Sequence, residues 1–225
     1  MDNRTKNKLL SHPSEIGKVL KIVNALNPKN RDKGTKNNTI KLGAVLRNNS
    51  CFKIEGTGNT IIVEDFSRLI DTNIYIHGNN NRIHIGKRCY LKEAEFYIED
   101  AGNEIVIGDH TSVNGKTQFA TIEGTRILVG EDCMFSQDIN VRTGDAHSIV
   151  DSKNKRLNYS KDITIGNHCW IGMRSIIMKG AVIKENSVIG AGAIVTKAFE
   201  KGNCVITGTP GKIIQDNIDW LRERV

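Results

Sequence analysis

A six-residue repeat in the C-terminal half of the chain constrains its fold more than any other feature. Every sixth residue in this stretch is a branched aliphatic: Ile165, Ile171, Ile177, Ile183, Ile189 and Val195. The residue four places after each of the first five is small: Cys169, Ser175, Ala181, Ser187 and Ala193. A helix would space its apolar residues by three and four, and an ordinary strand would alternate them by two. The period of six therefore predicts an all-β solenoid, whose coils stack to bury a shared core.

A longer repeat of 22 residues lies upstream. Two aliphatic columns recur at this interval: Ile61, Ile83, Ile105 and Ile127, then Val63, Ile85, Ile107 and Val129. Three sides of six residues account for 18 of the 22, and the Gly/Asn-rich pieces at 56–59, 78–81, 100–103 and 123–126 supply the rest as one enlarged corner per coil. Stacked Asn59, Asn81 and Asn103 are expected to hydrogen-bond along this corner. Continuing the six-residue step predicts further inward side chains: Tyr75, Tyr97, Phe119 and Val141.

The two ends of the chain lie outside these repeats. The run Pro13 to Leu26 has apolar residues at helical spacing: Ile16, Val19, Leu20, Val23 and Leu26. This amphipathic helix either covers the edge of the first coil or lies on a membrane surface or a partner. A second short helix is expected over 215–224. We therefore divide the chain into an N-terminal helix and linker (1–37), a parallel β-helix (38–208) and a C-terminal tail and helix (209–225).

Composition limits the classes of partner and the compartment. The net charge of +7 and the pI of about 9.2 favour an anionic partner. No run of basic residues is interleaved with aromatics, so a phosphorylated cofactor or nucleotide sugar is favoured over nucleic acid. Five cysteines without paired spacing do not form a disulfide framework. No apolar run predicts a secretory signal or a membrane span, so we expect a cytoplasmic protein.

The regular pattern is interrupted once, after Val141. The chain leaves the predicted wall through RTGDAHSIVDSKNKRLNYSKD and returns at Ile163, with an excursion loop at 147–162. His147 occupies the position of the next inward aliphatic, and Asp145 lies two residues before it. A histidine can accept a proton at neutral pH, and a nearby carboxylate can select its tautomer. His147 and Asp145 are therefore candidate catalytic residues, with a structural role as the alternative.

Four runs carry a resemblance to a known family: RTGDAHSIVD, NYSKDITIGNHCWIG, GAGAIVTK and TGTPGKII. In order and spacing they resemble the capsular and cell-surface polysaccharide O-acetyltransferases of the hexapeptide-repeat acyltransferase family. The resemblance implies a left-handed parallel β-helix, a homotrimer with active sites between subunits, a sugar or polysaccharide acceptor and acetyl-CoA as co-substrate, without a metal. It also implies that His147 is the general base for direct attack of the acceptor hydroxyl on the thioester.

The same resemblance assigns residues to the binding of acetyl-CoA. Those expected to contact it are Trp170, Gly172, Gly190, Ala191, Gly192, Ala193, Thr196, Lys197, Pro210 and Lys212. Trp170 would line the cleft, the 190–193 segment would accommodate the pantetheine arm, and the two lysines would meet the phosphates and adenine. Plain edge packing for Trp170 and solvated lysines are the alternatives.

Other functions remain open at this stage. The same donor site would serve N-acetylation of an amino-sugar nucleotide, or acetylation of a small molecule such as serine or an antibiotic. A non-enzymatic structural or carbohydrate-binding solenoid needs neither His147 nor acetyl-CoA. A γ-class carbonic anhydrase uses the same prism, but it needs three zinc-binding histidines. His84, His110 and His168 fall at outward positions, and none forms a close ligand pair with His147, so the pattern disfavours a metal site.

Overall fold

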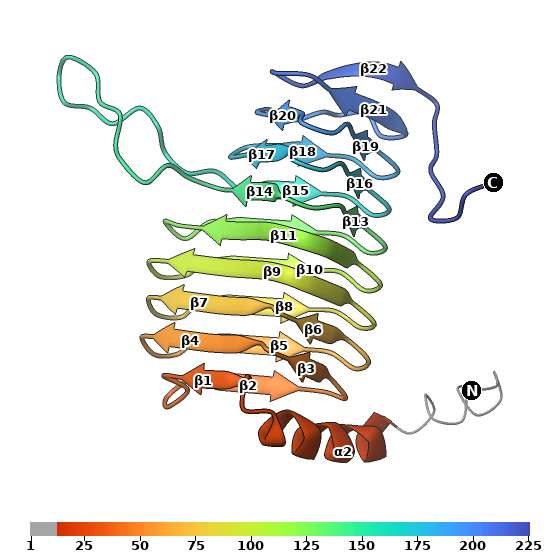
Figure 1. Ribbon diagram of the computed structural model, residues 1–225. Coiled ribbons are helices and arrows are strands. Elements are labelled where there is room, and N and C mark those ends of the chain that lie inside the picture. The colour runs from red at the N-terminus through yellow and green to blue at the C-terminus, as the bar shows by residue number, and fades with distance from the viewer. Residues whose placement is uncertain (1–12) are drawn as a thin grey trace.

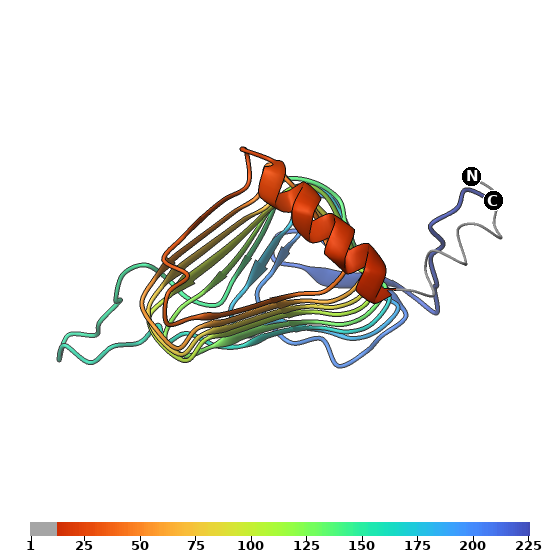
Figure 2. The same cartoon turned by 90° about the horizontal axis from the view of Figure 1, so that it is seen from below.

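The computed structural model describes residues 13–225 and consists of a stack of parallel strands with a helix across one end (Figure 1). Helix α2 (Pro13–Leu26) precedes the first coil. Viewed along the stack, the chain winds around three flat sides (Figure 2). The predicted all-β solenoid is thus confirmed. No helix within residues 13–225 is long and apolar enough to cross a membrane.

The first side of the prism is a sheet that lies at the same place in every coil. Its strands are β2 (Thr39–Leu42), β5 (Thr60–Val63), β8 (Arg82–Ile85), β10 (Glu104–Ile107), β12 (Arg126–Val129), β15 (Ile163–Ile165) and β18 (Val182–Ile183). The second side contains β3 (Leu46–Asn48), β6 (Arg68–Ile70), β13 (Met134–Phe135), β16 (Trp170–Ile171), β19 (Val188–Ile189) and β21 (Cys204–Thr207).

The third side contains β1 (Arg31–Lys33), β4 (Cys51–Glu55), β7 (Asn73–His77), β14 (Ile139–Arg142), β17 (Ile176–Met178) and β20 (Ile194–Val195). Two long strands, β9 (Tyr90–Glu99) and β11 (Ser112–Thr121), bend around a corner and belong to both the second and the third side.

The predicted 22-residue register is the observed one. Ile105 pairs with Ile83 on one neighbouring strand and with Ile127 on the other. At the corner, the Asn81 amide donates to Asn59 Oδ1 at 3.1 Å, and the Asn103 amide donates to Asn81 Oδ1 at 3.1 Å. These buried amides satisfy one another, so the Asn corner is structural, as expected.

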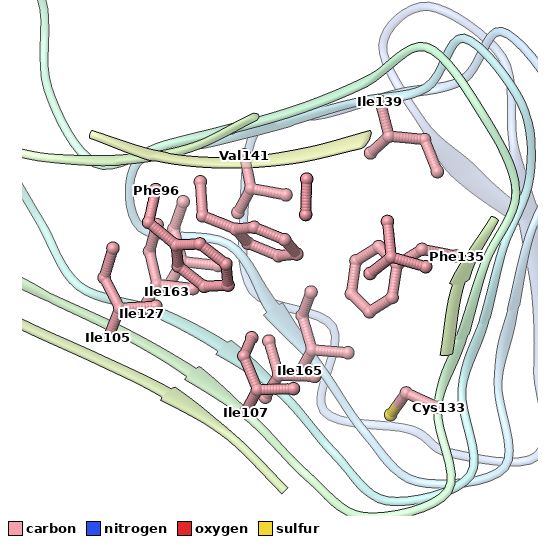
Figure 3. Close-up of a cluster of buried hydrophobic side chains, with 14 of the residues drawn as sticks. Phe96, Ile105, Ile107, Ile127, Cys133, Phe135, Ile139, Val141, Ile163 and Ile165 are labelled. Atoms are coloured by element: carbon pink, nitrogen blue, oxygen red, sulfur yellow. The ribbon is translucent and has the colours of Figure 1, made fainter. Parts of the chain in front are cut away.

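The core is a narrow column of stacked aliphatic and aromatic side chains (Figure 3). Phe119 lies between Phe96 and Phe135, with ring centroids 5.3 Å away on each side. The expectation that Tyr75 and Tyr97 point inward is wrong, because Ile74 and Phe96 are buried in their place. Strand β11 has one residue more than β9 between Asn114 and Thr117. A one-residue difference exchanges the inward and outward faces, so Tyr97 lies on the outer wall.

The C-terminal helix expected over 215–224 is absent. Strand β22 (Lys212–Asp216) instead turns back antiparallel to β21 and is followed by an extended tail. The pairing satisfies the backbone groups of β21 at the open end of the sheet, and it packs Ile213 on the core. A further difference lies at the other end, where the segment expected to be a linker contains β1.

Candidate active site

The excursion loop leaves the third side directly after β14 and projects away from the prism (Figure 1). Its outer part is a small hairpin, in which Val150 and Arg156 form an antiparallel bridge and the Leu157 amide donates to the Ile149 carbonyl at 2.8 Å. Strands β12 and β15 stay in register across the excursion, with Val129 opposite Ile165. The loop is therefore an insertion between two ordinary coils, as the sequence predicts.

A hydrogen-bonded cluster around Asn158 closes the base of this loop. The buried Asn158 amide donates to Asp145 Oδ2 at 2.7 Å and to the His147 carbonyl at 2.8 Å. Its Oδ1 accepts from the Ile149 amide at 2.7 Å. Lys179, just after β17, forms an ion pair with Asp145. The hydrogen bonds from Lys179 and Asn158 lower the pKa of Asp145, so its carboxylate is ionised at neutral pH.

A second anchor holds the returning strand of the loop. Arg156 and Ser160 both donate to Glu123 on the neighbouring coil, and the Ser160 hydroxyl lies 2.7 Å from Glu123 Oε2. The hydrogen bond from Arg156, followed by that from Ser160, lowers the pKa of Glu123 to about 2. Both ends of the excursion are therefore tied to the wall by charged hydrogen bonds.

His147 itself is exposed at the point where the loop leaves the wall. Within residues 13–225 its imidazole has no hydrogen-bond partner, and the Asp145 carboxylate is directed to Lys179 and Asn158. Asp145 therefore holds the backbone that carries His147, and it makes no hydrogen bond with the ring. A hollow of about 330 Å³ adjoins this point, and Tyr97, Gln118, Arg142 and Ala146 are among the residues that line it.

Several predicted donor-binding residues meet in a second hollow, of about 500 Å³. Trp170 of β16 lines it together with Gly172, Gly190 and Ala191. The Trp170 indole N–H donates to Ser136 Oγ at 3.3 Å, and the ring is partly exposed. The structure thus brings together four residues that the sequence assigned to one ligand.

The glycines of this hollow are required by coil stacking. A Cβ atom on Gly172 would lie 2.5 Å from the Ile189 carbonyl oxygen, and one on Gly190 would lie 2.6 Å from Thr207 Oγ1. Gly192 differs, because its Cβ position is open and its φ of +71° favours glycine. Ala193 is fully buried, so its side chain belongs to the core and only its backbone could meet a ligand.

The remaining predicted residues lie near the C-terminal end of the prism. Thr196 and Lys197 follow β20 and are exposed. The turn that carries Pro210 is fastened to the same strand, since the Ile194 amide donates to the Gly208 carbonyl at 3.0 Å. Lys212 begins β22 and is also exposed. Two lysines and open backbone near one end of the stack could meet an anionic group.

Sequence reasoning missed the contribution of the C-terminal tail. Trp220 is almost fully buried and stacks on His168 with ring centroids 4.4 Å apart. Its indole N–H donates to the His168 carbonyl at 2.8 Å, and its ring lies 6.1 Å from that of Trp170. Arg222 continues the contact by donating to Asp132 at 3.0 Å. The expected helical pattern around Ile218 and Leu221 concealed this role.

His168 lies beneath the tail between two hydrogen-bond acceptors. Its Nδ1–H donates to Asp132 at 2.7 Å and its Nε2–H donates to the Trp220 carbonyl at 3.0 Å. Burial alone would lower the pKa of His168, but these hydrogen bonds outweigh it and raise the pKa. Among residues 13–225 no group of three His, Cys, Asp or Glu side chains could hold a metal ion.

The two candidate regions lie on different corners of one chain. Trp170 lies in β16 on the second side, whereas the loop with His147 leaves after β14. The third side, formed here by β14, β17 and β20, separates them. A single chain therefore presents a possible proton acceptor at one corner and a ligand groove at another.

Comparisons with known proteins relate this architecture to an enzyme family. The bacterial transferase hexapeptide (six repeats) family model matches residues 162–197. A polysialic acid O-acetyltransferase of Neisseria meningitidis is 32% identical over 189 residues, which cover 83% of this chain and 87% of the relative. A second, from Escherichia coli O1:K1 / APEC, is 38% identical over 97 residues, or 43% of this chain and 31% of the relative.

Solved structures extend the similarity to most of the chain. The polySia specific acetyltransferase NeuO superposes with a TM-score of 0.81 at 32% identity, covering 86% of this chain and 88% of that chain. The polysialic acid O-acetyltransferase OatWY superposes with a TM-score of 0.83 at 30% identity, covering 87% and 92%.

The chain belongs to the hexapeptide-repeat transferases, and its fold is the left-handed parallel β-helix of that family. Within the family it is an acyltransferase, similar over most of its length to polysialic acid O-acetyltransferases. The alternative of a purely structural or carbohydrate-binding solenoid is thereby set aside.

Proposed function

We propose that this protein is an acetyl-CoA-dependent O-acetyltransferase that acts on a sugar hydroxyl of a surface polysaccharide or its precursor. The observation that carries the proposal is the similarity to polysialic acid O-acetyltransferases over 83% of the chain, which includes the loop with Asp145 and His147. Five free cysteines, four of them buried, are compatible with a reducing cytoplasm, where we place the reaction.

In this mechanism His147 removes the proton of the acceptor hydroxyl as its oxygen attacks the thioester carbonyl of acetyl-CoA. The C–O bond forms, the C–S bond breaks, and free CoA leaves as the thiol after protonation of its sulfur. Asp145, Asn158 and Lys179 do not touch the substrates. They hold the backbone of His147, so that the imidazole is positioned before the acceptor arrives.

The donor would lie in the groove of Trp170, with its anionic end toward Lys197 and Lys212. The aromatic face and the exposed backbone of Gly190 and Ala191 suit a thin, partly apolar pantetheine arm. The acceptor ring would occupy the hollow beside the loop, where Tyr97 offers a surface for stacking and Gln118 and Arg142 offer hydrogen bonds.

The separation of the two regions supports an assembly in which neighbouring chains complete each site. If the loop corner of one chain faces the groove corner of another, His147 of the first meets the donor held by Trp170 of the second. Repeating the contact around a three-fold axis gives a closed homotrimer. The exposed Ile149, Leu157 and Tyr159 of the loop are apolar side chains that such a contact would cover.

The test is release of free CoA thiol when the purified protein is mixed with acetyl-CoA and polysialic acid. His147→Ala should lower kcat by about 10² to 10⁴ with the fold unchanged. His84→Ala is the matched control, because His84 lies on the wall away from the loop and should retain full activity. Full activity of His147→Ala would contradict the assignment of the base.

A panel of acceptors separates O-acetylation from the alternatives. Neutral glycans, amino-sugar nucleotides, serine and chloramphenicol should be tested beside polysialic acid, with the product located by mass spectrometry. A mass increase on an amine, in place of a sugar hydroxyl, would favour the N-acetyltransferase alternative. Light scattering at working concentration tests the trimer independently of turnover.

A further inference from the structure

The net charge of the described residues, 13–225, is concentrated at one end of the prism. Residues 13–41 contain seven Lys and Arg against two Asp and Glu, which gives a net charge of +5. Residues 42–225 contain 22 residues of each sign and are neutral. The exposed bases of α2 and the first coil are Lys18, Lys21, Lys29, Arg31, Lys33, Lys36 and Lys41. This end therefore attracts anions, while the remainder of the prism carries no net charge.

The acidic residues at this end do little to offset the bases. Glu15 and Asp32 are the only carboxylates within 13–41. Asp32 is already engaged, since Arg47 donates to its two oxygens at 2.8 and 2.6 Å. The lysines of α2 therefore remain available to a partner.

Helix α2 packs on the first coil through a narrow face that is partly polar. Gly17 is buried against Ala44. The Asn24 amide donates to the Val45 carbonyl at 2.8 Å, and Asn24 Oδ1 accepts from the Arg47 amide at 2.9 Å. The face of α2 that packs on the first coil is not the one predicted by helical spacing. Three of the five apolar residues expected on the packed face are exposed.

The opposite face of α2 is an unpartnered apolar stripe. It consists of Val19, Ile22, Val23 and Leu26, whose exposed fractions are 61%, 62%, 46% and 76%. The helix runs across the end of the prism (Figures 1 and 2), so the stripe faces away from the coils along the stacking axis. Lys18 and Lys21 lie on the same helix and are exposed. An apolar stripe with basic residues beside it, on a flat end of a rigid body, suits a planar surface.

We propose that this end of the protein docks on an anionic lipid bilayer, with the α2 stripe inserted at the headgroup boundary and the surrounding lysines on lipid phosphates. Interfacial helices combine these two features. A soluble polyanion would satisfy the lysines but leave the apolar stripe in water. A second copy would cover the stripe but bring two strongly positive ends together. The proposal concerns location, so it does not depend on the reaction at His147.

The test is co-sedimentation of the full chain with vesicles of phosphatidylcholine alone or with about 30% phosphatidylglycerol. Binding is expected only with the anionic lipid, and it should weaken as salt is raised. Lys18→Glu/Lys21→Glu should weaken binding at least 25-fold, from about fivefold per lost basic residue. Ile22→Ser/Leu26→Ser should weaken it about tenfold or more, since the inserted apolar area is lost.

A matched charge swap elsewhere serves as the control. Lys87→Glu/Arg88→Glu changes the net charge equally on a middle coil, where both residues are exposed, and should bind as the original chain does. Circular dichroism and thiol release in solution verify that each variant is folded. Absence of binding to either vesicle, or equal weakening by the control, would overturn the proposal. A third outcome would also overturn it: the chain binds dextran sulfate but no vesicle, and Ile22→Ser/Leu26→Ser binds dextran sulfate equally well.

Discussion

Replacing Asn158 by alanine isolates the part that loop closure contributes to catalysis. Asn158 lies 11 residues from His147 in sequence and does not face either hollow, yet its amide joins Asp145, the His147 carbonyl and the Ile149 amide. The variant removes these three hydrogen bonds, together with a longer one that Asn158 Oδ1 accepts from Arg156 at 3.4 Å, and it leaves the imidazole, the donor groove and the core unchanged. A loss of rate would therefore report the position of His147.

The expected magnitude follows from these bonds. Two of them join neutral groups and contribute about 1 kcal/mol each, and the one to the Asp145 carboxylate contributes about 2 kcal/mol. Lys179 still holds Asp145 in the variant, and water replaces part of the rest, so about half of this total should be lost. About 2 kcal/mol of positioning corresponds to a fall in kcat of about 30-fold.

The assay is steady-state thiol release with acetyl-CoA and the best acceptor. The KM for acetyl-CoA should stay within about twofold, because Trp170 and Gly190 lie on another corner. Trypsin should cleave the loop of Asn158→Ala faster, since Lys153, Lys155 and Arg156 lie within it. Ser152→Ala, at the exposed tip, is the control. A kcat within twofold of the original, with faster cleavage, would refute the link between loop closure and catalysis.

Three other perturbations test the loop, the tail and the Asn corner. The hydrogen bond from Lys179 is the main cause that lowers the pKa of Asp145 in the folded protein. The ionised carboxylate therefore stabilises the loop fully above about pH 4, the pKa of Asp in an unfolded chain, and this stabilisation is lost as pH falls through the lower pKa of the folded state. The protection of loop amides against hydrogen exchange, relative to their intrinsic rates at each pH, should fall below about pH 4 in the original chain, and Asp145→Asn should lack this dependence. Trp220→Ala should lower Tm by about 6 °C and raise the KM for acetyl-CoA more than it lowers kcat. Trp220→Phe should restore both Tm and KM. An unchanged KM in Trp220→Ala would show that the tail only stabilises the fold. Asn81→Ala should lower Tm by about 10 °C because it interrupts the buried ladder. The exposed Asn80→Ala should lower it by only a few degrees, the cost of alanine at a φ of +56°, and equal shifts would contradict the ladder's importance.

The aliphatic columns were sufficient to predict the prism and its register. Ile83, Ile105 and Ile127 pair as their spacing requires, because a solenoid coil contacts only the next coil and the repeat length itself sets the pairing. The interruption after Val141 was equally visible, because an insertion is conspicuous in a periodic pattern. The resemblance then supplied a function for His147 that periodicity alone does not contain.

The wrong predictions concern features that depend either on a shift of one residue in a strand or on a contact with a distant part of the chain. Tyr97 was assigned to the core, but its own strand has one residue fewer than β11 at the bend, and this shift places Tyr97 on the outer wall beside the loop. The residues from Gln215 onward were assigned to a helix, but the chain there first pairs as strand β22 with the open edge of β21. Helical spacing identified α2, but it did not predict that the face with Gly17 and Asn24 would pack on the first coil.

By itself, the sequence determined the repeating core, the corner at which the chain departs and the candidate base at that corner. These features are periodic or local, so they can be recognised without knowing what lies opposite. Only the tertiary structure decided that Lys179, 34 residues beyond Asp145, neutralises its charge, and that Trp220 reaches back 52 residues to His168. Such contacts depend on which coils stack and how far the tail reaches, and no residue pattern along the chain encodes either distance.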